Sequence, residues 1–142
     1  MNRQEFSQIL KEAREDAGLS KYRVAKDCGF EDYQVGIIED ARNSFLIRNM
    51  FKYLNAIKHS LYIVEVETKR MTLIQAPEQF NLLLEKMREN MGVSQITAAE
   101  LTGVKVGVIR RVENDQSAGI TVDNFLKCVY GLGCRVLVIK RQ

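Results

Sequence analysis

The chain has 142 residues, of which 46% are hydrophobic and 27% are charged, and its formal net charge at pH 7 is +3. This composition lies in the range of soluble globular proteins, so the chain can form one ordinary domain or two small ones. The longest apolar runs, 61–64 and 136–139, are far shorter than the roughly 18 residues of a membrane-spanning segment. The opening residues are charged, so we expect no signal peptide, no membrane association and a cytoplasmic location.

Few residues are suited to catalysis or to metal binding. Cys28, Cys128 and Cys134 are odd in number and lack C-x-x-C spacing, and His59 is the one histidine. This pattern indicates neither a disulfide framework nor a zinc site, so we predict no metal and no cofactor. Nothing resembles a nucleophile with its base, a paired-carboxylate site or a phosphate-binding glycine loop, and we therefore do not expect an enzyme.

The sequence contains an internal repeat. When residues 6–39 are aligned with residues 80–113 without gaps, nine of the 34 positions are identical. In each copy, apolar residues at helical spacing predict an opening amphipathic helix, which ends at a glycine. A serine then occupies the N-cap position of a shorter second helix, and a third helix follows within three residues of its end. Small alanine and glycine residues allow helices two and three to cross closely, as a helix-turn-helix requires.

The repeat continues beyond the third helix. Residues 49–66 match residues 123–140 after one inserted residue, and each segment predicts a fourth helix followed by a strand. A lone strand leaves its backbone groups unpaired, so we expect the runs LYIVEVE (61–67) and VLVIK (136–140) to pair with each other. The run MTLIQ is a candidate third strand before Pro77, which is expected to begin the next helix.

These patterns predict a mainly α fold with two helix-turn-helix units. A small antiparallel sheet, formed from the C-terminal strand of each unit, is expected to join them. The first unit is predicted to span 1–67 and the second 77–142, with 68–76 as a junction that holds the possible extra strand.

The stretch GVSQITAAELTGVKVGVIRRVEND, residues 92–115, resembles the Cro and lambda-repressor (XRE) family of helix-turn-helix proteins. The resemblance extends over both halves except the junction at 67–79. The end of each unit, most clearly residues 113–139, is similar to the HipB-type antitoxin branch, in which a C-terminal strand pairs between the subunits of a dimer. This likeness implies two lambda-repressor-like, HipB-like units fused into a single-chain pseudo-dimer.

The family likeness also implies two structural ion pairs. Arg14 would pair with Glu39, and Arg88 with Glu113, in each case linking the first helix to the end of the third. Both units keep both members, and a buried charge without its partner is costly, so we interpret these four residues as structural.

In the second unit, the family likeness implies a surface that reads the major groove of double-stranded DNA. The residues carried over are Gln95, Lys105, Val106, Gly107, Arg111 and Asn114, with Arg110 adding positive charge nearby. Arg111 can bond guanine, Lys105 and Gln95 can reach phosphate or base, and Val106 can contact a thymine methyl group. The alternative to DNA binding is that these basic residues form an ordinary solvent-exposed surface.

In the first unit, the same carry-over gives a poorer match to DNA. The corresponding residues are Lys21, Glu31, Asp32, Tyr33, Ile37 and Asp40. Carboxylates near the DNA backbone oppose binding, although acidic residues at a helix start also stabilise the helix. Tyr33 and Gln34 could still contribute a hydroxyl or an amide contact, and Lys21, Arg23 and Lys26 supply positive charge.

Three hypotheses follow from the sequence. The first is a sequence-specific transcriptional regulator, expected to act as a repressor, whose second unit makes most of the base contacts. The second is an antitoxin-like adaptor whose acidic first unit binds a toxin or another protein, and the third is an interaction module without DNA binding. Each is compatible with a monomer that acts as a pseudo-dimer or with a further homodimer.

Overall fold

A computed structural model describes residues 1–114 and 119–142, and within these ranges it contains eight helices and three strands. The elements in chain order are α1 (Arg3–Asp16), α2 (Lys21–Cys28), α3 (Asp32–Asp40), α4 (Ile47–Ala56), β1 (His59–Glu65), β2 (Met71–Ile74), α5 (Pro77–Asn90), α6 (Gln95–Thr102), α7 (Val106–Glu113), α8 (Val122–Gly131) and β3 (Cys134–Lys140). The prediction of a mainly helical chain with a small antiparallel sheet is confirmed. We refer to α1–α4 and α5–α8 as the first and second helical sets.

The three strands form one antiparallel sheet in the order β2-β1-β3. β1 pairs with β3, as the sequence predicts, and the segment that was the candidate third strand pairs with the other edge of β1 as β2. The prediction of a sheet formed from the C-terminal strand of each unit is therefore confirmed in part, because the sheet is antiparallel but has three strands. β1 and β2 follow one another as a hairpin and are not the C-terminal strands of separate units, because a short turn lets β2 satisfy the outer edge of β1.

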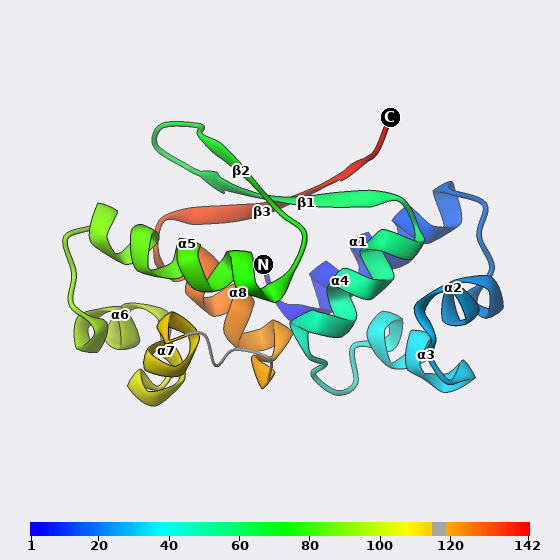
Figure 1. Cartoon of the computed structure of the whole chain (residues 1–142), viewed down its shortest axis with the longest axis horizontal. Helices are drawn as coiled ribbons and strands as arrows, with labels where there is room; N and C mark the ends of the chain where they lie inside the picture. Colours follow the sequence, from blue (N-terminus) through cyan, green and yellow to red (C-terminus); the bar gives the residue numbers. More distant parts are fainter. Residues whose placement is uncertain (115–118) are drawn as a thin grey trace.

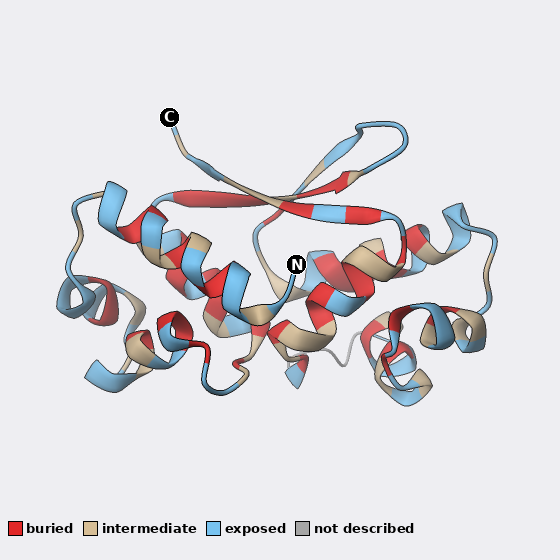
Figure 2. Cartoon of the chain, turned by 180° about the vertical axis from the view of Figure 1, so that it is seen from behind, coloured by how far each residue is buried: buried red, intermediate tan, exposed pale blue. Residues whose placement is uncertain are grey.

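The helices all lie on one side of the sheet (Figure 1). Leu61 and Ile63 of β1, with Val136 of β3, point toward the helices and are buried. In the helices, residues at the apolar spacing face inward, among them Phe6 and Phe80, which are fully buried at equivalent positions of the repeat. Figure 2 shows the same division, with buried residues on the inner faces of the helices and exposed residues on their outer faces.

The two helical sets correspond in length and in spacing. α1 and α5 each contain 14 residues, α2 and α6 contain 8, and α4 and α8 contain 10. The helix boundaries also follow the sequence signals, because Ser20 and Ser94 accept hydrogen bonds from backbone amides at the starts of α2 and α6. Pro77 begins α5, where its missing amide hydrogen costs no helical hydrogen bond.

Two antiparallel contacts join corresponding positions of the two sets. At the centre of the β1–β3 ladder, Tyr62 pairs with Leu137, 75 positions later. Just before α4 and α8, Leu46 forms an isolated bridge with Thr121, which is also 75 positions later. In an antiparallel pair of equivalent segments, a residue lies opposite its own counterpart only at the centre of the pairing. Each of the two contacts is therefore centred on a pair of equivalent residues, one from each helical set.

A buried ion pair links the first and third helices of each set. Arg14 donates from Nε and Nη2 to the carboxylate oxygens of Glu39, at 2.6 and 2.9 Å. Arg88 makes the same two bonds to Glu113, at 3.0 and 2.8 Å. Hydrogen bonding to the carboxylate raises the pKa of both arginines above its ordinary value, so each stays charged. The geometry supports the structural role expected for these four residues.

The surroundings of the two carboxylates differ. The Tyr53 hydroxyl donates to Glu39 Oε2 at 2.6 Å. The position equivalent to Tyr53 is Cys128, whose thiol is buried, and this burial raises its pKa to about 12. Instead, Gln95 donates from Nε2 to Glu113 Oε1 at 3.2 Å. Each carboxylate therefore has a third side-chain donor, supplied from a different helix in each set.

Gly131, at the end of α8, allows α6 to pack closely. A Cβ atom at this position would lie 2.8 Å from Thr102 Cα and 3.1 Å from the Leu101 carbonyl oxygen. The Thr102 hydroxyl donates to Ala98 O at 2.7 Å and accepts from the Val104 amide at 3.2 Å. The absence of a side chain on Gly131 thus lets α8 support the turn that connects α6 to α7.

We expect Glu39→Ala and Glu113→Ala each to lower the free energy of unfolding by about 3 kcal/mol, because each change leaves a largely buried arginine without its carboxylate. Urea denaturation measures this change. The matched control is Asp27→Ala, which removes an exposed ion pair with Arg23 and should cost less than about 1 kcal/mol. An unchanged unfolding midpoint for Glu113→Ala would contradict the structural role of the pair.

We expect Gly131→Ala to lower the free energy of unfolding by about 1–3 kcal/mol, because the new methyl group overlaps backbone atoms of α6. The matched control is Gly36→Ala within α3, where a Cβ atom meets nothing within 4 Å. That change should leave stability equal or raise it by up to about 1 kcal/mol through helix propensity. If thermal denaturation shows the two variants to be equally stable, the close approach of α6 and α8 is not a constraint.

Candidate nucleic-acid interface

The second helical set contains a helix-turn-helix made of α6 and α7. The Ser94 hydroxyl accepts from the Thr97 amide at 3.1 Å and begins α6, and Gly103 ends it in the left-handed conformation with φ of +75°. Val104 in the turn is buried, which fixes the turn against the core. α7 then begins after Lys105, its N-cap residue. This sequence of cap, glycine and buried valine gives α7 a defined start.

α7 has one buried face and one exposed basic face. Ile109 and Val112 are buried in the core, whereas Lys105, Arg110 and Arg111 are exposed. The acidic exposed residue of α6 and α7 is Glu100, near the end of α6. Gly107 is also exposed, so the backbone near the start of α7 can be approached closely by a ligand.

The helix dipole separates the basic residues of α7 into two kinds. Arg110 and Arg111 lie in the last turn, where a positive charge stabilises the helix. Lys105 caps the N-terminus, where a positive charge is unfavourable, and its side chain makes no capping hydrogen bond. Helix stability therefore explains the two arginines but not Lys105, which makes Lys105 the more informative residue of the predicted DNA-facing set.

The other members of this set lie in different surroundings. Asn114 is exposed directly after α7, and Val106 is half-buried in its first turn. Gln95 lies at the start of α6, but its side chain is half-buried and its amide donates to Glu113. Asn114 is thus accessible to a ligand, whereas the Gln95 side chain contacts the buried Arg88–Glu113 pair. The sequence did not predict this contact.

The first helical set has the same scaffold with a different surface. α3 begins with Asp32 after the N-cap residue Glu31, and both are exposed. The Gln34 side chain accepts from the Glu31 amide at 2.7 Å, so its oxygen caps the helix. Tyr33 is 67% exposed and has its side chain in solvent.

The basic residues of α2 are exposed, although one of them has an acidic partner. Lys21 and Lys26 lie on the surface of the helix. Arg23 donates from Nε to Asp27 at 3.1 Å across one helical turn. The start of α3 is therefore acidic and the nearby positive charge is partly neutralised, in contrast to the exposed basic start of α7.

Two contributions to the site were absent from the sequence-based prediction. Tyr53 completes the hydrogen bonding of Glu39, and Thr102 holds the turn between α6 and α7. The repeat offered a signal for the first, because Tyr53 aligns with the smaller Cys128, so the two units differ at this buried position. No sequence signal identified Thr102, since its role depends on the close approach of Gly131.

The remaining candidate residues lie in structural positions. Cys128 and Cys134 are buried, Cys28 is half-buried with its thiol 3.3 Å from the Lys52 carbonyl oxygen, and burial raises the pKa of all three thiols. His59 is buried, with Nδ1 2.8 Å from Ile57 O. In the described ranges 1–114 and 119–142 no group of three or more histidine, cysteine or acidic side chains could hold a metal ion.

No helix in the described part of the chain is both long and apolar enough to cross a membrane.

Comparison with known families gives one match. Residues 84–138, from within α5 to within β3, match the helix-turn-helix family model. Searches of curated proteins and of solved structures gave no match. A domain of this kind implies DNA binding and is typical of regulators that are not enzymes. Residues 84–138 are therefore similar to helix-turn-helix domains of the XRE type.

Proposed function

We propose that the chain is a sequence-specific double-stranded DNA-binding repressor that acts as a single-chain pseudo-dimer. In this proposal residues 1–67 and 77–142 are two related units, and α7 of the second unit makes most of the base contacts. The observation that carries the proposal is the exposed basic start of α7 within a domain whose family binds DNA.

The pairing of equivalent positions supports the pseudo-dimer. Tyr62 meets Leu137, and Leu46 meets Thr121, as residues related by a two-fold axis would. α3 and α7 both lie on the side of the molecule away from the sheet (Figure 1). Two helices presented to the same side are the arrangement with which dimeric helix-turn-helix proteins meet two half-sites of one duplex.

The difference between α3 and α7 supports an asymmetric target. Lys105 at the start of α7 can contact phosphate, whereas Glu31 and Asp32 at the start of α3 repel phosphate and can accept a hydrogen bond from the cytosine amino group. The two helices would then favour different bases. A homodimer has identical faces and reads a palindrome, so a fused chain with divergent faces suits a non-palindromic operator.

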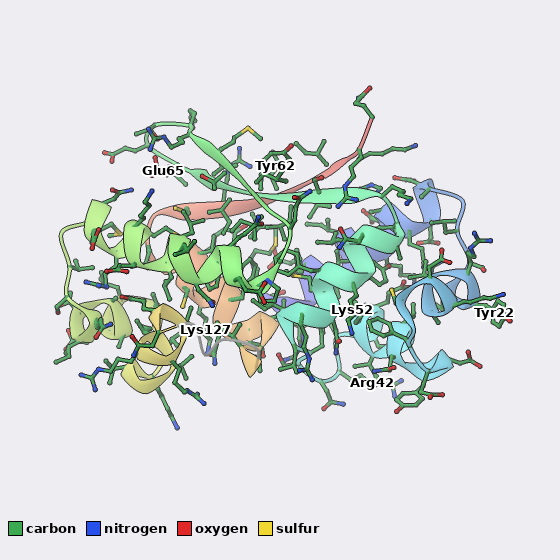
Figure 3. The ribbon with its side chains drawn as sticks, viewed as in Figure 1. Tyr22, Arg42, Lys52, Tyr62, Glu65 and Lys127 are labelled. Atoms are coloured by element: carbon green, nitrogen blue, oxygen red, sulfur yellow. The ribbon has the colours of Figure 1, made fainter. Side chains whose placement is uncertain are left out.

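A second candidate function is favoured by the exposed aromatic residues of the first helical set. Tyr22 and Tyr33 are 68% and 67% exposed, and Tyr33 directly follows the acidic residues Glu31 and Asp32. Tyrosine is enriched at protein interfaces, and the acidic start of α3 would suit a basic partner. Figure 3 shows Tyr22 projecting outward from the end of the molecule that carries α2. This face would then bind a protein while α7 holds DNA.

The test is selection of bound fragments from a random duplex library by the whole chain and by a Lys105→Ala, Arg111→Ala double variant. We expect the parent chain to recover a non-palindromic motif. The double variant should lose at least about 30-fold in affinity for that motif, because two contacts of at least about 1 kcal/mol each are removed. Affinity should also fall steeply as salt is raised, since bound cations are released from the phosphates.

The matched control is a Lys86→Ala, Arg70→Ala variant, which removes the same charge from exposed residues of α5 and the hairpin turn. It should recover the parent motif. Recovery of no motif at low salt would refute DNA reading, and a palindromic motif would refute the asymmetric target. A protein that co-purifies with the double variant, and is lost on Tyr33→Ala, would establish the second candidate.

A further inference from the structure

A pocket lies at the seam between the two helical sets, and we call it the seam pocket. Its volume is about 490 Å³, which is the size of pockets that bind small molecules. The first residues of the chain form one wall and lie beside α8 (Figure 1). α6 and α8 of the second set form the others. The lining includes Arg3, Leu101, Asp123, Leu126, Lys127 and Tyr130.

The seam pocket offers apolar side chains to a ligand. Leu101, in the last turn of α6, is 49% exposed, so burial in the core does not account for this leucine. The Tyr130 hydroxyl accepts a hydrogen bond from the Val136 amide at 3.1 Å, which holds the tyrosine ring in the pocket wall. Leu126 is buried and also lines the pocket. A ligand with an apolar body would remove the exposed part of Leu101 from water.

A pocket at the equivalent place of the first set, between α2 and α4, is polar instead. Asp27 has the place in α2 that Leu101 has in α6, and Asp27 accepts from Arg23 at 3.1 Å. Asn55 has the place in α4 that Tyr130 has in α8. The scaffold of the repeat thus accommodates polar side chains at both positions. The apolar lining is therefore a difference between the two sets and not a requirement of their common fold.

The charged residues of the seam pocket leave one positive charge available. Arg3, at the start of α1, forms an ion pair with Asp123 of α8, so these two charges offset each other. Lys127 is exposed, and it forms no ion pair or side-chain hydrogen bond within residues 1–114 and 119–142. A single ammonium group matches a ligand with one negative charge. A phosphate group carries about two charges at pH 7 and is better held by several donors.

We propose that the seam pocket binds a small carboxylate with an apolar body. The apolar body would pack against Leu101 and Tyr130, and the carboxylate would accept a hydrogen bond from the Lys127 ammonium group. Small-molecule pockets generally combine apolar walls with a few polar groups that fix the orientation of the ligand. A hydrogen bond between two charged groups is stronger than a neutral one, so Lys127 would provide much of the selectivity for an anion.

The position of the seam pocket has a consequence that rests on the proposed DNA binding. Residues of both helical sets line the pocket, so a ligand in it would stabilise the present arrangement of the two sets. In this arrangement α3 and α7 lie on the same side of the molecule (Figure 1). Thr102, whose hydroxyl holds the turn before α7, also lines the pocket. We therefore expect the bound carboxylate to raise the affinity of the chain for its DNA motif.

The experiment is an NMR titration of the full chain, without DNA, with cinnamate and with octanoate. These carboxylates carry an aromatic and an alkyl body, and their neutral amides serve as control ligands. We expect at least one carboxylate to shift the amide resonances of Leu101 and Lys127 and to bind with a dissociation constant below about 1 mM. Its neutral amide should bind at least about fivefold more weakly, because it lacks the charge that Lys127 neutralises.

The test variants are Lys127→Gln and Leu101→Asp. Lys127→Gln should lower the affinity for the carboxylate to that for its neutral amide. Leu101→Asp, which copies the counterpart residue, should lower the affinity for the carboxylate at least about tenfold through lost apolar contact and charge repulsion. The matched control is Lys52→Gln, which removes the equivalent lysine from the polar pocket and should leave binding unchanged. Thermal denaturation should show all three variants to be folded, because the substituted side chains are exposed.

Absence of binding by both carboxylates at about 10 mM would overturn the proposal. An equal loss of affinity in Lys52→Gln, or no loss in Lys127→Gln, would also overturn it, since the carboxylate would then lie elsewhere. Binding at the seam pocket by a chain that selects no DNA motif would uphold the site while refuting the proposed function.

The effect on DNA binding is measured separately, with the motif recovered from the duplex library. Saturating carboxylate should raise the affinity of the parent chain for this motif at least about fivefold, relative to acetate at the same concentration. The same addition should leave the affinity of Leu101→Asp unchanged. An unchanged affinity of the parent chain would refute the coupling between the pocket and DNA.

Discussion

The antiparallel pairing of β1 with β3 is the constraint on which the rest of the structure depends. These strands come from positions 75 residues apart, and their ladder is centred on Tyr62 and Leu137. Because the ladder is continuous from His59 to Glu65, it determines how the two helical sets are oriented about the sheet. The bridge between Leu46 and Thr121 repeats this relation below the sheet, so two separate contacts hold the same arrangement. The common orientation of α3 and α7 away from the sheet follows from these contacts.

Within each helical set, a buried carboxylate determines where the third helix ends. Glu39 and Glu113 each receive two hydrogen bonds from an arginine of the first helix and one from a further side chain. A buried charge is tolerated only when its partners are in place, so the pair strongly favours one relative position of the two helices. That position also determines where the exposed residues of α3 and α7 lie. Because these residues are not part of the buried pair, they can differ between the two sets, and the start of α3 is acidic whereas the start of α7 is basic.

The sequence predicted much of the fold because the signals involved are local. Helical spacing, serine caps, helix-ending glycines and Pro77 all act within a few residues, and the helices begin and end close to where these signals place them. The candidate interface was less predictable. Gln95 and Gln34 were expected to face DNA, yet the first donates to Glu113 and the second caps α3. An amide side chain bonds whichever partner lies nearest, and sequence spacing alone does not show which partner that is.

The sequence by itself determined the repeated helices and the contrast between the starts of α3 and α7, because these depend on residue type and short-range spacing. The two arginine–glutamate pairs, whose members lie 25 positions apart, were implied by the family likeness. Only the tertiary structure decided that β2 occupies the outer edge of β1, that Gly131 makes room for Thr102, and that a pocket forms at the seam between the two helical sets. Each of these features depends on which distant segments meet. Contacts between distant segments depend on the packing of the whole chain, because strand pairing and close helix packing form together and are not determined by any single residue.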